Sequence, residues 1–239
     1  RFHFGKWKTE EADFAGRHLL QTPDGIAVDQ EKYIREQLST MYLTKDRRSQ
    51  PESPLSRDEI SSHRTVAVQV QWLARESRPD VAGSASLLAA ALPAPSVADA
   101  LALIKVCKHV KAPLEQRLTT WALDPSSVTF VTASDAGGPG SARRGGAQGA
   151  WLITVADSAI RDDRRARVSL PAWRSPRIKR AAPSTVAAET LALPGATGEA
   201  QWMQVLWRDA VWGDVPRPDW FEKQGPFSMM LARECQLSE

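Results

Sequence analysis

Cysteine is scarce in this sequence. The 239 residues contain only Cys107 and Cys235, which are far apart and have no C-x-x-C spacing. A disulfide framework and a cysteine-based zinc site both need more cysteines in closer groups, so neither is predicted. We interpret both residues as buried or incidental thiols.

Long hydrophobic runs are also missing. No uninterrupted apolar stretch approaches the roughly 20 residues of a membrane-spanning helix. The start, RFHFGKWK, lacks the apolar region of a signal peptide. These features predict an intracellular protein, in the cytoplasm or nucleus, with no membrane partner. Because the chain begins with Arg1 rather than Met, we expect it to be part of a longer polypeptide.

The net charge is only +3, but the basic residues are concentrated in one segment. From Ser141 to Arg180 the chain carries ten Lys or Arg against three Asp, so this segment is +7 and the rest of the chain is −4. A local basic field suits a polyanion, because phosphates that are neutralised release their counterions. Charge alone leaves open the alternative of solvated strands with arginine on the wet face.

The N-terminal part of the sequence indicates a hairpin followed by helices. The runs ADFAGRHLLQ and IAVDQ flank residues 22 to 25, TPDG, where Pro and Gly favour a hairpin turn. EKYIREQL predicts a short helix, and the polar, proline-bearing residues 44 to 57 predict a linker. Helical spacing and N-caps then predict three helices between residues 57 and 112. His63 and His109 fall in these helices and are interpreted as core or surface residues rather than metal ligands.

The spacing of apolar residues changes from helical to strand-like after this helical region. Residues 128 to 134, 147 to 156 and 166 to 175 are predicted as three strands. STVAAETLAL, residues 184 to 193, opens with a Ser N-cap and predicts a helix that ends before Pro194-Gly195. Three successive strands followed by a helix favour an α+β unit in which the helix packs on the sheet.

An acid stands where the first of these strands ends. The stretch VTFVTASDAGG, residues 128 to 138, changes from β-branched and aromatic residues to Asp135 and two glycines. In one interpretation this is a turn, where the carboxylate caps backbone donors and the glycines supply positive φ. In the other, the carboxylate points into a site beyond the sheet edge.

These runs, taken in order, resemble a known family. VTASDAGG, AQGAWLITVAD and AWRSPRIKRAAPSTVAAETLAL resemble the ribonuclease H (RNase H) domain of copia-type retrotransposon Pol polyproteins. Upstream, FAGRHLLQTPDGIAVDQEKYI and VQWLARESRPDVAGSASLL resemble the connection region that follows the polymerase palm in the same polyproteins. The resemblance covers most of the chain, from Phe2 to Trp220, and rests on the collinear order of the motifs.

The resemblance implies both a fold and a domain organisation. The fold is α+β, an RNase H-like mixed sheet with a packed helix, preceded by a helical connection region and an N-terminal β-hairpin. Residues 1 to 112 would be the reverse-transcriptase connection region, and residues 113 to 239 the RNase H-like domain. The polymerase part of the polyprotein would lie upstream and be a partner of this chain.

The resemblance also implies a reaction. Enzymes of this kind cleave the RNA strand of an RNA/DNA hybrid with a metal-bound water, using magnesium ions held by clustered carboxylates. The family has an Asp at the end of the first strand and a Glu in the first helix, so Asp135 and Glu189 are the implied catalytic residues and Mg²⁺ ligands. The basic residues that would hold the nucleic acid are Arg143, Arg144, Arg174, Arg177, Lys179 and Arg180.

The sequence departs from the family pattern at the third acid. A working site needs a further carboxylate, which the family carries on a strand after the helix. Asp209 is the candidate, but it falls inside the apparent helix EAQWMQVLWRDAVW. We therefore expect an RNase H-like domain that is truncated at its C-terminus and has an incomplete active site, and enzymatic activity stays open. The alternatives are a catalytically inactive nucleic-acid-binding module and a structural remnant of the same polyprotein.

Overall fold

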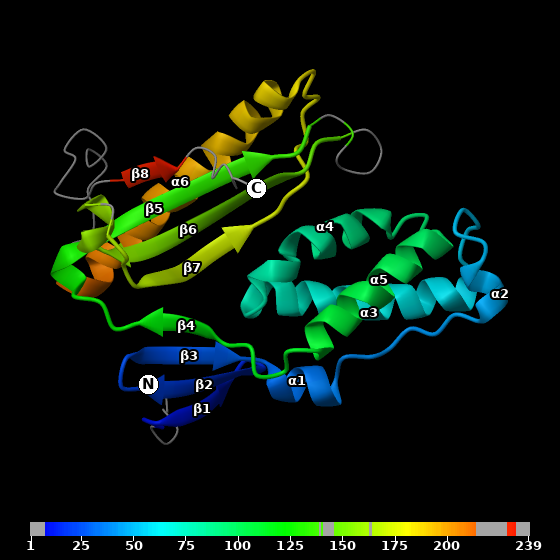
Figure 1. Ribbon diagram of the computed structural model, residues 1–239, viewed down its shortest axis with the longest axis horizontal. Helices are drawn as coiled ribbons and strands as arrows, with labels where there is room; N and C mark the ends of the chain where they lie inside the picture. The colour runs from blue at the N-terminus through cyan, green and yellow to red at the C-terminus, as the bar shows by residue number, and fades with distance from the viewer. Residues whose placement is uncertain (1–7, 139, 141–145, 163, 214–228, 233–239) are drawn as a thin grey trace, which may run out of the picture. The chain divides into compact units, whose positions relative to one another are not determined.

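The computed structural model describes residues 8–138, 140, 146–162, 164–213 and 229–232 (Figure 1). It is an α+β protein that divides into two compact units, unit 1 (Arg1–Ala122) and unit 2 (Leu123–Glu239). The boundary follows Ala122 rather than the expected residue 112, because a strand just before the boundary pairs with the N-terminal hairpin. None of the described helices is long and apolar enough to cross a membrane.

Unit 1 begins with a four-stranded antiparallel sheet, in the order β1-β2-β3-β4. The predicted hairpin is confirmed, with Thr22 opposite Gly25. A side chain at position 25 would meet the Thr120 carbonyl oxygen, so the approach of β4 requires glycine there. β1 and β4 were not expected from the sequence. The strands are β1 (Glu11–Phe14), β2 (Arg17–Thr22), β3 (Gly25–Asp29) and β4 (Leu118–Trp121).

Helices form the rest of unit 1. Ser56 and Glu59 begin the longest of them with a reciprocal capping box, in which each side chain accepts from the other residue's backbone N–H. Apolar residues such as Val70, Leu73 and Leu103 are fully buried in the core that the helices share. The expected linker contains a short helix, α2. The helices are α1 (Glu31–Glu36), α2 (Lys45–Arg48), α3 (Arg57–Glu76), α4 (Ala82–Ala91) and α5 (Val97–Lys111).

Three residues that the sequence left without a chemical role are explained by this packing. His63 is buried in α3, and exposed His109 lies 2.9 Å from the Asp80 carboxylate. Cys107 is buried in α5, and burial raises the pKa of its thiol to about 11. The thiol therefore stays protonated at neutral pH and is a poor nucleophile. Cys235 lies outside the described residues.

Unit 2 is built on a second four-stranded sheet, in the order β7-β6-β5-β8. The three predicted strands are confirmed as adjacent and antiparallel, and they are β5 (Val128–Ala136), β6 (Gly149–Asp157) and β7 (Val168–Arg174). A fourth strand, β8 (Met229–Ala232), pairs parallel with β5. β8 was not expected from the sequence, because MMLA is short and has no β-branched residue to favour a strand.

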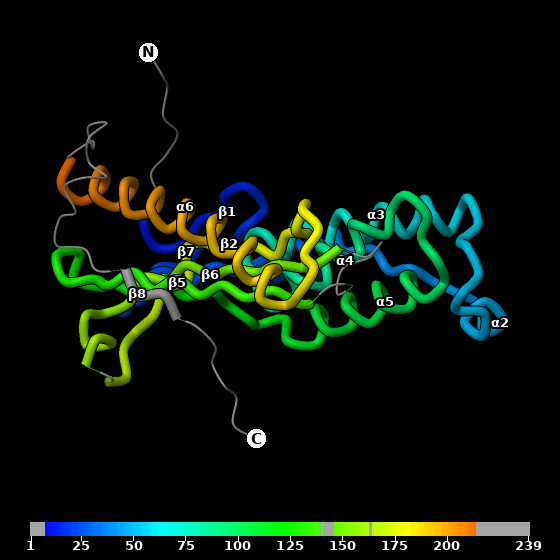
Figure 2. Tube along the Cα trace, turned by 90° about the horizontal axis from the view of Figure 1, so that it is seen from above, coloured from blue at the N-terminus to red at the C-terminus, as the bar shows by residue number. Residues whose placement is uncertain are grey.

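One long helix, α6 (Thr185–Trp212), packs against this sheet. It was expected to end before Pro194, and that expectation is wrong: the helix continues through Pro194 to a left-handed Gly213. Alanines at every fourth position, Ala188, Ala192, Ala196 and Ala200, are buried on both sides of the proline. A continuous contact with the sheet thus offsets the lost backbone hydrogen bond. Figure 2 shows α6 on one side of the sheet and the connection after β6 on the other.

Candidate carboxylate site and basic surface

The two faces of the unit 2 sheet differ in what covers them. Phe130 of β5 and Val155 of β6 are opposite each other and pack with Ala196 and Ala200 of α6. Phe130 also meets Trp207 of α6 edge-to-face, with ring centroids 6.1 Å apart. We call this side of the sheet the inner face. Because side chains alternate along a strand, every second residue of β5 and β6 belongs to the opposite side, the outer face, and β7 follows the same alternation from Ala172 to Arg174, beyond an irregularity in its pairing with β6.

Asp135 belongs to the outer face. Its neighbour Ala136 packs on the inner face against Ala188 and Ala192 of α6, so the side chain of Asp135 points away from the helix. Asp135 is exposed, and its carboxylate accepts a hydrogen bond of 2.8 Å from the backbone N–H of Ala136. This bond is the local capping contact of the turn interpretation.

Glu189 lies at the same end of unit 2, on the other side of the sheet. A methyl group at Gly138 would lie 3.2 Å from the Thr185 hydroxyl, so the chain leaving β5 passes the first turn of α6. Glu189 follows Thr185 by one turn, is half-buried and adjoins the inner-face residue Ala188. The fold therefore brings Asp135 and Glu189 to one end of the sheet, but from opposite faces.

The third expected acid does not join them. Asp209 is exposed near the C-terminal end of α6, about 30 Å from Glu189 along the helix axis at a rise of about 1.5 Å per residue. Asp209 is thus too far away to complete a site with Glu189, which corrects that candidate. Within the described ranges, no group of three His, Cys, Asp or Glu side chains is arranged to hold a metal ion. The described carboxylates therefore do not fit the two-magnesium site that the resemblance implies.

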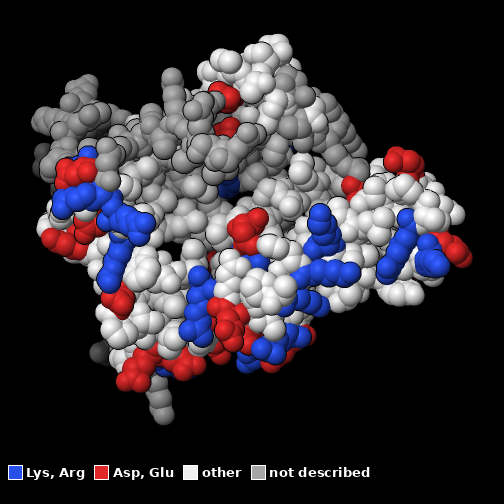
Figure 3. Space-filling model, in the orientation of Figure 1, with Lys and Arg blue, Asp and Glu red and all other residues white. Residues whose placement is uncertain are grey.

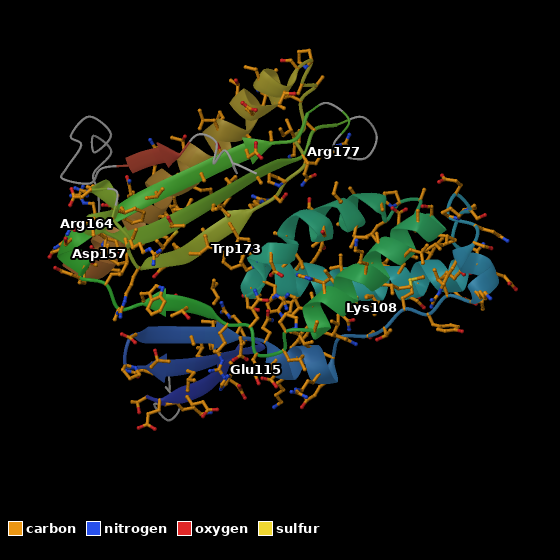
Figure 4. All side chains as sticks on the ribbon, in the orientation of Figure 1. Lys108, Glu115, Asp157, Arg164, Trp173 and Arg177 are labelled. Atoms are coloured by element: carbon orange, nitrogen blue, oxygen red, sulfur yellow. The ribbon has the colours of Figure 1, made fainter. Side chains whose placement is uncertain are left out.

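The basic segment is split between the two ends of the sheet. β5 and β7 run in one direction and β6 in the other, so the connection after β6 lies at the end of unit 2 opposite Asp135. That connection carries Arg161, Arg164, Arg165 and Arg167, whereas the Asp135 end carries Arg174, Arg177, Lys179 and Arg180. Figure 4 shows Arg164 and Arg177 at these opposite ends. Arg143 and Arg144 lie outside the described residues.

The cations at the Asp135 end of unit 2 are exposed. Among the described residues, no carboxylate forms an ion pair with Arg174, Arg177, Lys179 or Arg180, and all four are exposed. Arg174 is opposite Trp151, an inner-face residue, while Arg177 forms an antiparallel bridge with Gln148. Because Gln148 alternates with the inner-face Ala147 and Gly149, Arg177 belongs to the outer face. Such a group is available to an external anion.

At the other end, two of the arginines have protein partners. The Nε of Arg161 donates to the hydroxyl of buried Thr129 at 2.7 Å, and Arg164 pairs with Asp162 at 2.7 Å. Figure 3 shows acidic side chains among the basic ones at this end. Arg161 was not expected to have a role of its own, because its contact with Thr129 spans 32 positions and leaves no local pattern in the sequence.

No protein-family model matches the chain, and no curated protein or solved structure matches it either. The α+β architecture is therefore established by the fold itself. The resemblance to copia-type polyproteins stays a prediction that rests on the quoted motifs alone.

Proposed function

We propose that this chain is the C-terminal part of a copia-type reverse transcriptase polyprotein and that its RNase H-like unit binds RNA/DNA hybrid without cleaving it. The observation that carries the proposal is the group of exposed cations at the Asp135 end of unit 2, with which no described residue forms an ion pair. In water, cations of this kind gain affinity for a polyanion mainly by releasing counterions from its phosphates.

The fold supports the resemblance in its order of elements. Three antiparallel strands are followed by a helix on one face and then by a further strand beside the first. The family likewise carries a strand after the helix, and its third acid is on that strand. Here β8 has the sequence MMLA and contains no carboxylate. Binding without hydrolysis is therefore the function that the described residues support best.

Salt dependence of hybrid binding tests the proposal. Replacing Arg177 and Arg180 together by Ala should weaken binding of a fluorescein-labelled RNA/DNA hybrid, measured by anisotropy over a series of salt concentrations. Each lost phosphate contact should reduce the slope of log affinity against log salt by about 0.7 to 0.9. The matched control replaces Arg64 and Arg75 of α3, which are also exposed, and so changes the net charge equally. Equal slopes for both double variants would contradict the proposal.

A cleavage assay separates binding from hydrolysis. We expect no magnesium-dependent cut in the RNA strand of the hybrid, while the Asp135→Asn variant binds the hybrid as tightly or more tightly, because one repelling charge is removed. Magnesium-dependent cleavage that disappears in Asp135→Asn and in Glu189→Gln would instead establish the hydrolytic function that the resemblance implies.

A further inference from the structure

The outer face of the unit 2 sheet is apolar in its middle and cationic at its two ends. We propose that this face binds single-stranded nucleic acid, with a base stacked on Trp173 and phosphates held by Arg177 and Arg161. The proposal rests on the nucleic-acid binding proposed above, and it names the surface and the kind of strand. Figure 4 shows Trp173 on β7 and Arg177 beyond the end of that strand.

Strand pairing defines the middle of this face. Leu152 of β6 is opposite Ala133 of β5 on one side and Trp173 of β7 on the other, so these three side chains form a row across the sheet. Leu152 is 43% exposed, although it lies in a central strand. Val131 and Thr154 form the next row, and the Thr154 hydroxyl donates to the Val131 carbonyl oxygen. The middle of the outer face thus places the half-buried indole of Trp173 beside an exposed leucine, and the described side chains of these rows carry no charge.

The two cations lie beyond the ends of these rows. Arg177 is bridged to Gln148, past the C-terminal end of β7. Arg161 is fixed over Thr129, at the other end of β5, by a 2.7 Å bond from its Nε and a 3.4 Å bond from its Nη2 to the Val128 carbonyl oxygen. Within the described residues these bonds leave the Nη1 donors of Arg161 unused, and the residue is exposed. At about 3.3 Å per residue, the two ends are about 25 Å apart.

This distribution of charge favours a single strand over a duplex. A duplex presents phosphates on its outside and hides its bases, so it would set phosphates against the uncharged middle of the face. A single strand turns its bases toward an apolar platform and keeps its phosphates for cations along the path. Asp135, also on the outer face and at the same end of the sheet as Arg177, opposes a phosphate at that end. Asp135→Asn should therefore tighten binding of a single strand as well.

Oligonucleotide binding by matched variants tests the proposal. The probes are fluorescein-labelled oligo(U) and oligo(dT) of about 12 nucleotides, within the range of site sizes known for single-strand-binding modules. Trp173→Ala should weaken binding roughly 5- to 150-fold, the range for loss of one stacked base. Arg177→Ala should reduce the salt slope by about 0.7, the value for one phosphate contact on a single strand.

Each variant has a control on the same unit that lies off the outer face. Trp202→Ala removes an indole of α6 that is 56% exposed, and Arg208→Ala removes a cation of the same helix, which packs on the inner face. Both controls should leave single-strand affinity within about twofold of the unchanged protein, whereas Trp173→Phe should retain most of it, because a phenyl ring still stacks. Far-ultraviolet circular dichroism and thermal melting check that each variant is folded. If Trp173→Ala is not folded, Leu152→Glu takes its place as the test. This change puts a negative charge at an exposed position in the same row, so it should weaken binding of the oligonucleotide by repelling its phosphates.

The outcomes separate this proposal from the hybrid-binding function. Two outcomes would overturn the single-strand proposal while hybrid binding persists. In the first, neither oligonucleotide binds. In the second, Trp173→Ala and Leu152→Glu leave oligonucleotide affinity unchanged, and the outer face would then be left for a protein partner. Equal losses in Trp173→Ala and Trp202→Ala overturn it as well. A chain that binds neither hybrid nor single strand overturns both proposals.

Discussion

The two units handle their charged side chains in opposite ways. In unit 1 the guanidinium of Arg78 is 1% exposed, donates to the Asp80 carboxylate from two nitrogens and to the Val110 carbonyl oxygen, and so joins the ends of α3 and α5. In unit 2 the cations near Asp135 are exposed and form no ion pair with any described residue. A charge inside a protein must be neutralised there, whereas an exposed one is already stabilised by water. Buried Arg78 of unit 1 therefore holds the fold together, whereas the exposed cations near Asp135 in unit 2 are available for an external anion.

The acidic partners of unit 1 cations have lowered pKa values. Burial acts most strongly on Asp80 and opposes its ionisation, yet the hydrogen bonds from Arg78 and His109 together lower the pKa of its carboxyl. Hydrogen bonds from Arg47 lower the pKa of Glu59 to about 2. Both carboxylates are therefore ionised near neutral pH and stay paired with cations of the same unit.

The largest effect should come from Arg78→Ala. This change leaves the Val110 carbonyl oxygen without the Arg78 donor and the Asp80 carboxylate with only its contact to His109, and it should lower the free energy of unfolding of unit 1 by about 3 to 5 kcal/mol. Hydrogen exchange of α3 and α5 amides measures it. Arg75→Ala, an exposed arginine one turn earlier, is the control and should change stability by less than about 0.5 kcal/mol. Equal losses in the two variants would remove the contrast between buried and exposed cations.

A smaller effect is expected in the core of unit 2. Ala196 is fully buried between α6 and the sheet, so Ala196→Leu forces the helix away from Phe130 and should cost about 1 to 3 kcal/mol. Exchange of β5 and β6 amides reports the loss. Val186→Leu, at a position of α6 that is 70% exposed, should leave the same amides unchanged. Tolerance of leucine at position 196 would mean that α6 is not held by close packing.

The pH dependence of the unit 1 sheet should be smaller still. Contacts with Asp29 and then Glu11 raise the pKa of His18 above its ordinary value, at distances of 3.2 and 2.8 Å. Protonated His18 therefore stabilises the β1–β2–β3 pairing below the unfolded-state pKa near 6.5, and this contribution is lost as the pH rises through the folded-state pKa. Because His18 is only partly buried, we expect about 0.2 to 1 kcal/mol. Exchange of β2 amides across this pH range measures it, and His18→Gln should abolish the dependence.

The smallest effect on stability should come from the cations of unit 2. Replacing Arg177 and Arg180 by Ala should change the free energy of unfolding of unit 2 by less than about 0.5 kcal/mol, because no described residue forms an ion pair with them. Thermal melting of the variant measures this change. The same double variant should lose hybrid affinity. A stability loss comparable to that of Arg78→Ala would show that these arginines serve the fold, as Arg78 of unit 1 does.

Local chemistry in the sequence determined most of the secondary structure. The turn at residues 22 to 25, the Ser56 capping box and the alternating strands of residues 128 to 174 all depend on neighbours within a few positions, so their patterns are visible in the chain. The end of α6 was predicted wrongly at Pro194 because that prediction also rested on local chemistry. A proline predicts a helix end locally, but the alanine contact with the sheet on both sides of it decided otherwise.

Tertiary structure alone decided the arrangement of the candidate site. The sequence treats residues 141 to 180 as one basic segment, but antiparallel pairing carries Arg164 and Arg177 to opposite ends of the sheet. The packing of α6 on the sheet also brings Asp135 and Glu189 to the same end of unit 2. Because successive side chains of a strand point to opposite faces, Asp135 points away from α6. A shift of one residue in that strand would reverse the face. The sequence determined which side chains are charged, but which of them meet depends on strand register and helix packing over long separations in the chain.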